Sequence, residues 1–543
     1  MQPVRLCRQG RPDLLYGRAL AVMAWLCLGA LLADAGSAEE AARHRLDRIP
    51  VSELDAVPGA HGRGRSPQRQ RSPASDKAEP ALPPEATTHH SVTLADRMLS
   101  FTAKAGASTF EDAQGSTVAE IGYFAYLLDH ADRRTRPVTF VINGGPGAAS
   151  AWLHIGALGP WRLPITQADA HPTAPADLVP NAETWLDFTD LVFIDPVGTG
   201  YSRLASTDDA IKDKFWSVQG DINAIAVFIK HWLQANDRLD APKRLVGESY
   251  GGFRAPRLAQ TLQSMPGLAL DAIILVSPAF ATPATDFPGL GDALIRAAAF
   301  PSLAAAIAGS KGPVSAEQLA AFEREAVSGY LPDMLAGPRD KAAVERLAQR
   351  IAAVTGIAVD TVRQLGPRAS AQTFLREIDR TSGRVSSTYD ATEKRVAAYD
   401  GPDLIDGGDD LRDLSLRLER AMVRLVEGPF GWRPQRQYRV LARDVGWSWK
   451  GQDSVTALRS GLVRDPTLQV LIAHGYADLV TPYLRTKLIL DQLPTIGADN
   501  NSRVRLKIYG GGHMLYTRDG SRAQLRADAS RLYTEMAAAR GAH

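Results

Sequence analysis

The residues with the clearest chemical potential begin with a serine in a glycine-flanked turn. Ser249 lies in Gly-Glu-Ser-Tyr-Gly, a G-x-S-x-G motif that directly follows an apolar run of strand length and precedes a helix-like stretch. A tight strand-to-helix turn pushes the serine hydroxyl clear of the sheet, and the flanking glycines leave room for the neighbouring chain. Ser249 is therefore the predicted nucleophile, although Gly and Ser are common enough for chance to produce the motif.

An acid and a base that could activate this serine follow it in the order that the motif requires. Asp478 comes after the apolar run L-Q-V-L-I-A-H-G, and His513 comes after V-R-L-K-I-Y, within G-G-G-H-M. His513 would take the proton from Ser249, while Asp478 would orient the imidazole and stabilise its cation. The alternative interpretations are a surface-loop histidine and an aspartate that caps a turn. The position of both residues after strand-like runs favours catalysis.

A glycine-rich segment could supply donors for the oxyanion that acyl transfer creates. Asn-Gly-Gly-Pro-Gly at 143–147 directly follows a strand-like run, and a turn here would expose backbone N–H groups. We predict that the N–H groups of Gly145 and Tyr250 form the oxyanion hole. A phosphate-binding loop is the alternative, but neither the P-loop lysine pattern nor G-x-G-x-x-G is present.

The other histidines are not predicted to do chemistry. His474 ends a strand-like run just before Asp478, so we interpret it as support for that loop. His130, His154 and His231 show no metal-ligand spacing with one another. Neither a metal site nor a cofactor is predicted.

The elements that must position these residues alternate, beyond about Ser91, between short apolar runs and longer helical stretches. This alternation predicts an α/β fold with a mostly parallel sheet flanked by helices. Continuous apolar runs suit strands that are covered on both faces. The predicted strands are 138–142, 191–194, 244–246, 272–276, 468–473 and 504–509.

A block with helical periodicity interrupts the strand series. Its apolar residues recur every three or four positions, as on one face of an amphipathic helix; they are Leu411, Leu414, Leu418, Met422 and Leu425. The stretches 316–325 and 341–354 also look helical. We therefore predict a helical insertion at 281–440 over the sheet edge that carries the active site. The core is then divided into 91–280 and 441–543.

The segment 1–38 has the composition of an export signal. Several arginines precede an apolar run at 19–32, and small residues follow it. This run is shorter than the roughly 20 residues that cross a bilayer, so a cleaved signal is favoured over a retained anchor. The prediction is a secreted or periplasmic protein. The only cysteines, Cys7 and Cys27, lie within this segment, so no disulfide is predicted in the mature chain.

The composition is globular and indicates no polyanionic partner. The chain is 45% hydrophobic and 22% charged with a formal net charge of +2, which does not build the broad basic face that nucleic-acid binding needs. Residues 39–90, rich in Pro, Arg and Ser, are predicted to be a disordered linker. Its arginines could touch an anionic envelope surface, but a solvated tether is favoured. No nucleic-acid partner and no membrane span after signal cleavage are predicted, and the oligomeric state stays open.

Taken together, several motifs resemble those of the serine carboxypeptidase family in order and approximate spacing. They are N-G-G-P-G, D-P-V-G-T-G-Y-S at 195–202, G-E-S-Y-G-G, the Asp478 loop and G-G-H-M. The resemblance spans about 140–514. It implies an α/β-hydrolase fold with a helical insertion, the same triad and oxyanion hole, and release of C-terminal residues from peptides. It also implies that Asn143, Gly144 and Glu248 bind the terminal carboxylate of the substrate.

Two positions depart from the family pattern. Family members carry a second glutamate on the helix after N-G-G-P-G, which shares a proton with the glutamate before the serine; this place is taken by Ala157. Two carboxyl groups in contact cannot both ionise, so such a pair can donate a proton to a substrate carboxylate at acidic pH. With Ala157 we expect a weaker demand for a free C-terminus and less bias toward acidic pH. Ala148 replaces a cysteine that is usual in eukaryotic members, which is consistent with a bacterial branch.

These features predict an exported serine-type carboxypeptidase that acts on peptides through a Ser-His-Asp triad and an acyl-enzyme. A serine esterase or an acyltransferase would use the same machinery, and the incomplete carboxylate pair leaves both open. A non-catalytic binding protein on a hydrolase scaffold is a further alternative, although such proteins usually lack a triad member.

Overall fold

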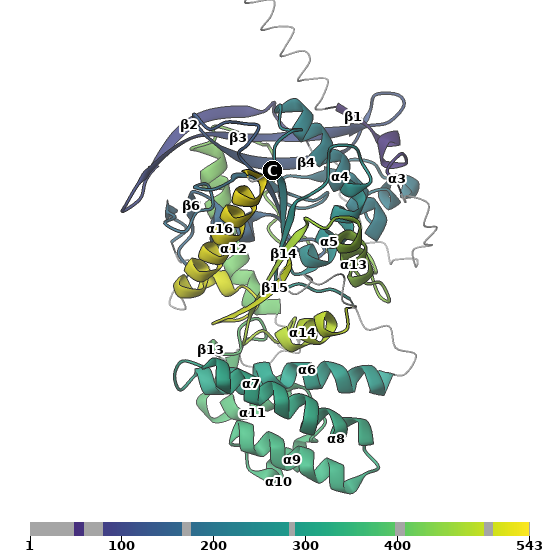
Figure 1. The fold of residues 1–543 in the computed structure, drawn as a ribbon, viewed down its shortest axis with the longest axis vertical. Helices are drawn as coiled ribbons and strands as arrows, with labels where there is room; N and C mark the ends of the chain where they lie inside the picture. Colours follow the sequence, from purple (N-terminus) through teal and green to yellow (C-terminus); the bar gives the residue numbers. More distant parts are fainter. Residues whose placement is uncertain are drawn as a thin grey trace, which may run out of the picture.

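An eleven-stranded mixed sheet organises the chain (Figure 1). The computed structural model describes residues 48–58, 80–165, 175–281, 288–396, 408–493 and 503–541. The strand order is β1-β3-β4-β8-β5-β10-β11-β14-β15, with β2 paired to β3 and β9 paired to β4. The strands are β1 (Arg48–Pro50), β2 (Ala86–Thr93), β3 (Met98–Glu111), β4 (Thr117–Leu128), β5 (Val138–Ile142), β8 (Asp190–Ile194), β9 (Arg203–Leu204), β10 (Lys243–Glu248), β11 (Ala272–Val276), β14 (Gln469–Gly475) and β15 (Val504–Tyr509).

The part of the sheet that carries the predicted site is parallel. The strands β8, β5, β10, β11, β14 and β15 run side by side in one direction, and β4 joins them antiparallel at β8. All six strands predicted from apolar runs are present within two residues of their expected ends. The predicted α/β fold is confirmed.

Helices cover both faces of this sheet, as Figure 1 shows. Alternate residues of one strand point to opposite faces: Val141 of β5 belongs to the hydrophobic cluster that includes α12 and α16, whereas Phe140 and Ile142 belong to the cluster that includes α4, α5 and α13. Burial on both faces explains the continuous apolar stretches of the central strands β5, β8 and β11. The helices of the core are α3 (Asp209–Asp213), α4 (Val218–Ala235), α5 (Tyr250–Gln263), α12 (Gly408–Glu427), α13 (Val455–Arg464), α14 (Tyr483–Asp491) and α16 (Asp519–Gly541).

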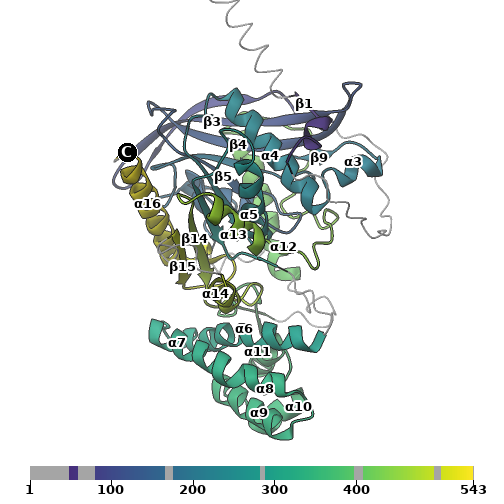
Figure 2. The same cartoon turned by 45° about the vertical axis from the view of Figure 1, so that its right-hand side comes forward.

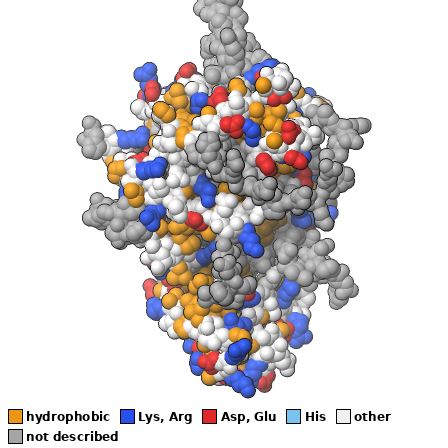
Figure 3. Space-filling model, turned by 90° about the vertical axis from the view of Figure 1, so that its right-hand side faces the viewer, with side chains coloured by type: hydrophobic (Ala, Val, Ile, Leu, Met, Phe, Trp, Pro, Cys, Tyr) orange, Lys and Arg blue, Asp and Glu red, His pale blue; other side chains and the backbone are white. Residues whose placement is uncertain are grey.

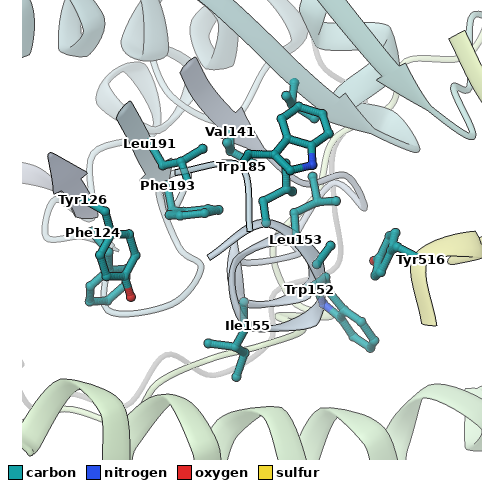
Figure 4. Close-up of a cluster of buried hydrophobic side chains, with 14 of the residues drawn as sticks. Phe124, Tyr126, Val141, Trp152, Leu153, Ile155, Trp185, Leu191, Phe193 and Tyr516 are labelled. Atoms are coloured by element: carbon teal, nitrogen blue, oxygen red, sulfur yellow. The ribbon is translucent and has the colours of Figure 1, made fainter. Parts of the chain in front are cut away.

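A short helical segment after β5 is buried in the larger hydrophobic cluster. It consists of α2 (Ala151–Leu153) and η2 (His154–Leu158). Figure 4 shows Leu153 on the side of this segment that faces Trp185 and the strand residues, Ile155 on the opposite side, and Trp152 on the side of Tyr516. All of these side chains are buried. The turn before this segment is therefore held on a rigid support. The two-stranded pair β6 (Trp161–Arg162) and β7 (Val179–Pro180) follows it.

The helical insertion forms a lobe at the lower end of the molecule in Figures 1 and 2. It has its own hydrophobic core, which includes Phe300, Leu347 and Phe374 and continues into Tyr483 and Leu484 of α14. The lobe is thus packed on the segment that follows Asp478. Its elements are α6 (Pro288–Gly309), α7 (Ala316–Glu325), η4 (Ala326–Tyr330), α8 (Leu331–Ala336), α9 (Lys341–Thr355), α10 (Val359–Leu365), α11 (Ala371–Asp379), η5 (Arg380–Ser382) and the hairpin β12 (Arg384–Ser386) and β13 (Lys394–Val396).

Two expected boundaries are corrected by the structure. The stretch 39–90 is not a linker throughout: β1 pairs with β3, Ile49 is fully buried, and β2 begins at Ala86. Its few apolar residues are enough to dock these short pieces. The amphipathic helix in 281–440 exists as α12, but its apolar face packs on the core sheet rather than in the lobe. The spacing of apolar residues predicts that a helix has an apolar face, but it does not predict which part of the protein that face packs against. The predicted signal at 1–38 lies outside the described residues.

One described helix passes a length and hydropathy test for a membrane span. It is α6 over Gly291–Gly309, of which 61% is buried within the protein. A buried core helix passes the same test, so this is weak evidence for a membrane. Leu294 and Ile295 of α6 are exposed. On the face in Figure 3, hydrophobic side chains gather where the lobe meets the rest of the protein.

Candidate active site

The predicted nucleophile stands on a strained turn. Ser249 lies between β10 and α5 with φ 57° and ψ −119°, a conformation that costs a non-glycine residue energy. Its backbone N–H donates to Val276 O at 3.0 Å, and its carbonyl accepts from the Ala279 N–H at 3.0 Å. A side chain at Gly247 would place Cβ 2.3 Å from Gly251 O. The motif therefore needs glycine at 247 for close approach, as the sequence predicts.

Asp478 and His513 meet in a buried pair. His513 Nδ1 lies 2.9 Å from Asp478 Oδ2, and both residues are buried. Asp478 Oδ1 accepts from the backbone N–H groups of Val480 and Thr481 at 2.8 and 2.9 Å. Burial disfavours both charges, but their attraction is stronger: it holds the pKa of Asp478 below its usual range and raises the pKa of His513. An imidazole beside such a carboxylate can hold a transferred proton.

The carboxyl ends of four neighbouring strands bring the three predicted triad residues to one edge of the sheet. Ser249 follows β10, Asp478 follows β14 and His513 follows β15, and β11 lies between β10 and β14. Ser277, the residue after β11, links these ends because its hydroxyl donates to His513 O at 2.7 Å. The catalytic roles of the three residues stay predictions.

The predicted oxyanion turn lies directly on the nucleophile turn. A Cβ at Gly144 would be 2.6 Å from Tyr250 N and 2.8 Å from Ser249 Cβ, so only glycine fits. Gly145 has φ 99°, in the region that favours glycine. Both donor residues, Gly145 and Tyr250, are thus beside Ser249, although their role in binding an oxyanion stays a prediction.

Backbone contacts hold this turn at the place where the family would have a cysteine. Ala148 forms an isolated bridge with Leu441, and the Ala149 N–H donates to Val440 O at 3.0 Å. Asp195, from the D-P-V-G-T-G-Y-S motif, accepts from the Ser150 N–H at 2.8 Å and from its hydroxyl at 2.7 Å. Burial raises the pKa of Asp195 to about 6. These contacts fix the turn without a disulfide.

The three residues predicted to bind a carboxylate are adjacent. Asn143 donates from Nδ2 to Glu248 Oε2, and both side chains are buried. Gly144 packs against the carbonyl of Glu248, which a Cβ would approach to 2.7 Å. Burial, the largest influence, raises the pKa of Glu248 to about 7. A carboxyl group in this state is half protonated near neutral pH.

Tyr516 occupies the side of Glu248 that the sequence leaves without a partner. Its hydroxyl donates to Glu248 Oε1 at 2.9 Å, and it is 1% exposed. Its ring also lies against the segment that carries Ala157, where a Cβ at Gly156 would be 3.3 Å from Tyr516 Cε2. Ala157 is buried and brings no carboxyl group. A phenol therefore replaces a second acid as the neighbour of Glu248.

Sequence reasoning missed Tyr516 and Thr481. The Thr481 hydroxyl lies 2.7 Å from Asp478 Oδ2 and 3.1 Å from His513 Nδ1. It also lies 3.0 Å from Ser277 O. Thr481 is three residues after the predicted acid, close enough along the chain for an aspartate side chain to bond the local backbone, as Asp478 Oδ1 does with the Thr481 N–H. Tyr516 carries no comparable signal.

Two other histidines, His154 and His474, are buried, and His474 interacts with the Thr481 backbone and with the charges of Asp478 and His513. His474 is buried on β14, its Nε2 lies 2.9 Å from the Thr486 hydroxyl, and burial lowers the pKa of His474 to about 4. His154 stacks on Phe193, and burial lowers the pKa of His154 to about 3. Both are neutral packing residues. Within the described ranges, no group of three acidic, His or Cys side chains is arranged to hold a metal.

Comparisons with known sequences find similarity to serine carboxypeptidases over part of the chain. Residues 98–273 match the family model described as serine carboxypeptidase. A pheromone-processing carboxypeptidase kex1 of Neosartorya fischeri is 30% identical over 28% of this chain and 22% of its own length. A KEX1 of Arthroderma otae is 32% identical over 26% of this chain and 20% of its own. The chain thus aligns with about a fifth of the length of these curated relatives.

Solved structures of similar shape are also found. A prohormone-processing carboxypeptidase of Saccharomyces cerevisiae, Kex1(delta)p, is 16% identical, with a TM-score of 0.49 over 84% of this chain and 92% of its own. A proline iminopeptidase of Mycobacterium smegmatis is 16% identical, with a TM-score of 0.31 over 83% of this chain and 100% of its own. The family match covers residues 98–273, so this part of the chain is similar to serine carboxypeptidases.

Proposed function

We propose that this chain is a serine carboxypeptidase that releases C-terminal residues from peptides through Ser249, His513 and Asp478. The observation that carries the proposal is the buried Asp478–His513 pair, 2.9 Å from Nδ1 to Oδ2, at the strand ends beside the strained Ser249 turn. A serine hydroxyl is a weak nucleophile unless an oriented base takes its proton. The family match adds the substrate class.

The proposed reaction has two halves, acylation of the serine and hydrolysis of the acyl-enzyme. Ser249 Oγ attacks the carbonyl carbon of the last peptide bond and its proton passes to His513 Nε2. The N–H groups of Gly145 and Tyr250 donate to the resulting oxyanion. His513 then protonates the leaving amine, and the C–N bond breaks to give an acyl-enzyme. Water, deprotonated by His513, attacks the ester, and Ser249 Oγ leaves with the proton.

Asp478 serves the base rather than the substrate. Its Oδ2 accepts from His513 Nδ1, which leaves Nε2 as the nitrogen that exchanges a proton with Ser249. The negative charge also stabilises the imidazolium that forms in each half-reaction. Two backbone N–H groups and Thr481 hold the carboxylate in place.

The substrate carboxylate would bind between Asn143, Gly144 and Glu248. A protonated Glu248 can donate to a carboxylate, whereas an ionised one repels it. Since its pKa is about 7, recognition of a free C-terminus would weaken above neutral pH. With a phenol instead of a second acid beside Glu248, binding depends on one titrating carboxyl group.

A serine esterase or acyltransferase is the second candidate. The observation that favours it is the buried alanine at 157, because a substrate without a carboxylate needs no carboxyl pair. Peptide and ester turnover by the same preparation separate the candidates. A non-catalytic binding role would require that the folded protein fail to react with a fluorophosphonate probe.

Export is proposed from the arginine-rich and apolar start of the chain. Expression of the full chain followed by N-terminal sequencing of the exported product tests it. Cleavage near residues 35–38 supports a secreted or periplasmic enzyme, and an intact N-terminus in the cytoplasm contradicts it.

The decisive experiment digests one peptide in free-acid and C-terminally amidated forms, followed by mass spectrometry. Stepwise loss from the free acid alone, absent in Ser249→Ala, supports carboxypeptidase action with carboxylate recognition. Equal trimming of both forms would show that the carboxylate is dispensable. No trimming of either, with ester turnover retained, would replace the proposal by the esterase candidate.

A further inference from the structure

A loop of the helical lobe lies against both loops that carry the predicted base and acid. Residues 387–393 connect β12 and β13, at the joint between the lobe and the sheet in Figure 1. Tyr389 O accepts the backbone N–H of His513 at 2.5 Å. Thr388 O accepts from the Leu479 N–H at 3.1 Å. This loop is therefore hydrogen-bonded both to His513, the predicted base, and to Leu479, the residue after the predicted acid.

A third backbone bond and a ring contact complete the contact surface. The Ala391 N–H donates to Ala477 O at 3.1 Å. The Tyr389 ring lies edge-on to the His513 imidazole, with centroids 5.6 Å apart and planes at 72°. These contacts fix the position of the His513 backbone and cover one side of its ring.

The approach is so close that one residue of the histidine loop must be glycine. A Cβ at Gly512 would lie 1.9 Å from Tyr389 O and 2.4 Å from Asp390 Cα. By contrast, a Cβ at Gly510 would come no nearer than 3.5 Å to the Ser521 hydroxyl. The glycine run before His513 thus contains one position that depends on the loop and one that does not.

An ion pair fastens the loop to the segment after His513. Arg518 donates from Nε and Nη2 to Asp390 Oδ2 at 3.0 and 2.8 Å. Asp390 Oδ1 accepts from the N–H and hydroxyl of Thr392 at 3.1 and 2.6 Å. Asp390 is mostly buried, and both of its carboxylate oxygens accept hydrogen bonds from Arg518 or Thr392.

The other end of the hairpin is anchored in the lobe. Asp379, the last residue of α11, is buried and accepts from Lys394 Nζ at 2.6 Å and from the Ser386 hydroxyl at 2.6 Å. Lys394 and Ser386 stand at the two strands that bracket the loop. The loop therefore forms a continuous connection between the lobe and the histidine loop.

We propose that residues 387–393 are a positioning strap for His513, with Tyr389 as the contact and the Asp390–Arg518 pair as its latch. The strap acts through the base and rests on the proposed function only in that His513 activates Ser249. Loosening it should lower the rate of acylation with little change in substrate affinity. A displacement of about 1 Å in a catalytic group can cost on the order of 10²-fold in rate.

The test compares variants by the rate at which a small fluorophosphonate labels Ser249, and by kcat and KM on a substrate. Asp390→Asn removes the latch charge and should slow labelling about two- to fivefold, since Arg518 is partly exposed. KM and the thermal unfolding temperature should stay near wild type. Glu345→Gln, which breaks the exposed Arg363 pair in the lobe, is the matched control and should change nothing.

Gly512→Ala is the stronger perturbation, and Gly510→Ala is its control of equal size. Gly512→Ala should reduce kcat about 10²-fold and shift the pH at which His513 loses its proton, whereas Gly510→Ala should do neither. If Gly512→Ala fails to fold, Asp390→Asn decides. Wild-type labelling with unchanged rates in Asp390→Asn and Gly512→Ala would overturn the strap. A wild type that does not label would overturn the proposed function instead.

Discussion

Removing one hydroxyl beside Glu248 should move the pH range in which a free C-terminus is recognised. Tyr516→Phe keeps the ring that packs against the segment after β5 and deletes the group that donates to Glu248 Oε1 at 2.9 Å. That donor favours the ionised carboxylate and so lowers the pKa of Glu248, which burial raises to about 7. Its loss must therefore raise the pKa further.

The size of the shift follows from the strength of one charge-assisted hydrogen bond. Such a bond contributes about 1.5–3 kcal/mol, and one pKa unit corresponds to about 1.36 kcal/mol. The pKa of Glu248 should rise by roughly one to two units. The other neighbours of Glu248 are unchanged: Asn143 and His513 still lower its pKa and Asp478 still raises it.

The assay is kcat/KM against pH, on a free-acid peptide and on an ester that has no carboxylate. For wild type, the free-acid profile should fall as pH rises through about 7, because ionised Glu248 repels the substrate. In Tyr516→Phe this alkaline limb should move up by roughly one to two units, while the ester profile stays in place.

Tyr509→Phe is the matched control, since it deletes a phenol that donates to Asp528 at 2.8 Å, away from Glu248. It should leave both profiles unchanged. An alkaline limb that stays put, or moves to lower pH, in Tyr516→Phe would refute the assignment of Tyr516 and Glu248 to carboxylate recognition.

Three further substitutions test the triad and its surroundings. Asp478→Asn removes the charge that raises the pKa of His513, so kcat should fall about 10⁴-fold and the acidic limb of the pH profile should move to lower pH; stopped assays across pH measure both. Thr481→Val deletes the hydroxyl at 2.7 Å from Asp478 Oδ2 and should lower kcat about tenfold with KM unchanged; a loss in KM alone would contradict this. Gly144→Ala would put a Cβ 2.6 Å from Tyr250 N and should cost about 10²–10³-fold in kcat; full activity in a folded variant would remove the oxyanion hole from this place.

The sequence predicts well those elements whose pattern is local and strong. The six parallel strands each contain a run of apolar residues, and their ends lie within two residues of the prediction. The long antiparallel pair β3 and β4 was not predicted. These strands mix polar and small residues, such as Lys104 and Gly122, so they lack a strong apolar pattern. Their antiparallel pairing with each other stabilises them instead.

The candidate catalytic residues could be predicted from the sequence because they lie in motifs whose glycines are required by close backbone approach. The G-E-S-Y-G turn requires glycine at 247 for lack of space, and G-G-G-H-M contains Gly512, which touches the lobe hairpin. Tyr516 and the strap at 387–393 could not be found in this way. Their contacts join residues far apart in the chain, and neither has a spacing that marks it.

Mass spectrometry of a fluorophosphonate adduct tests most directly whether Ser249 is an activated nucleophile. The folded wild type should gain one phosphonyl group, and tandem spectra should place it on Ser249. The variants Ser249→Ala and His513→Gln should remain unlabelled under the same conditions. An unlabelled wild type, or an adduct on another residue that persists in Ser249→Ala, would contradict the account.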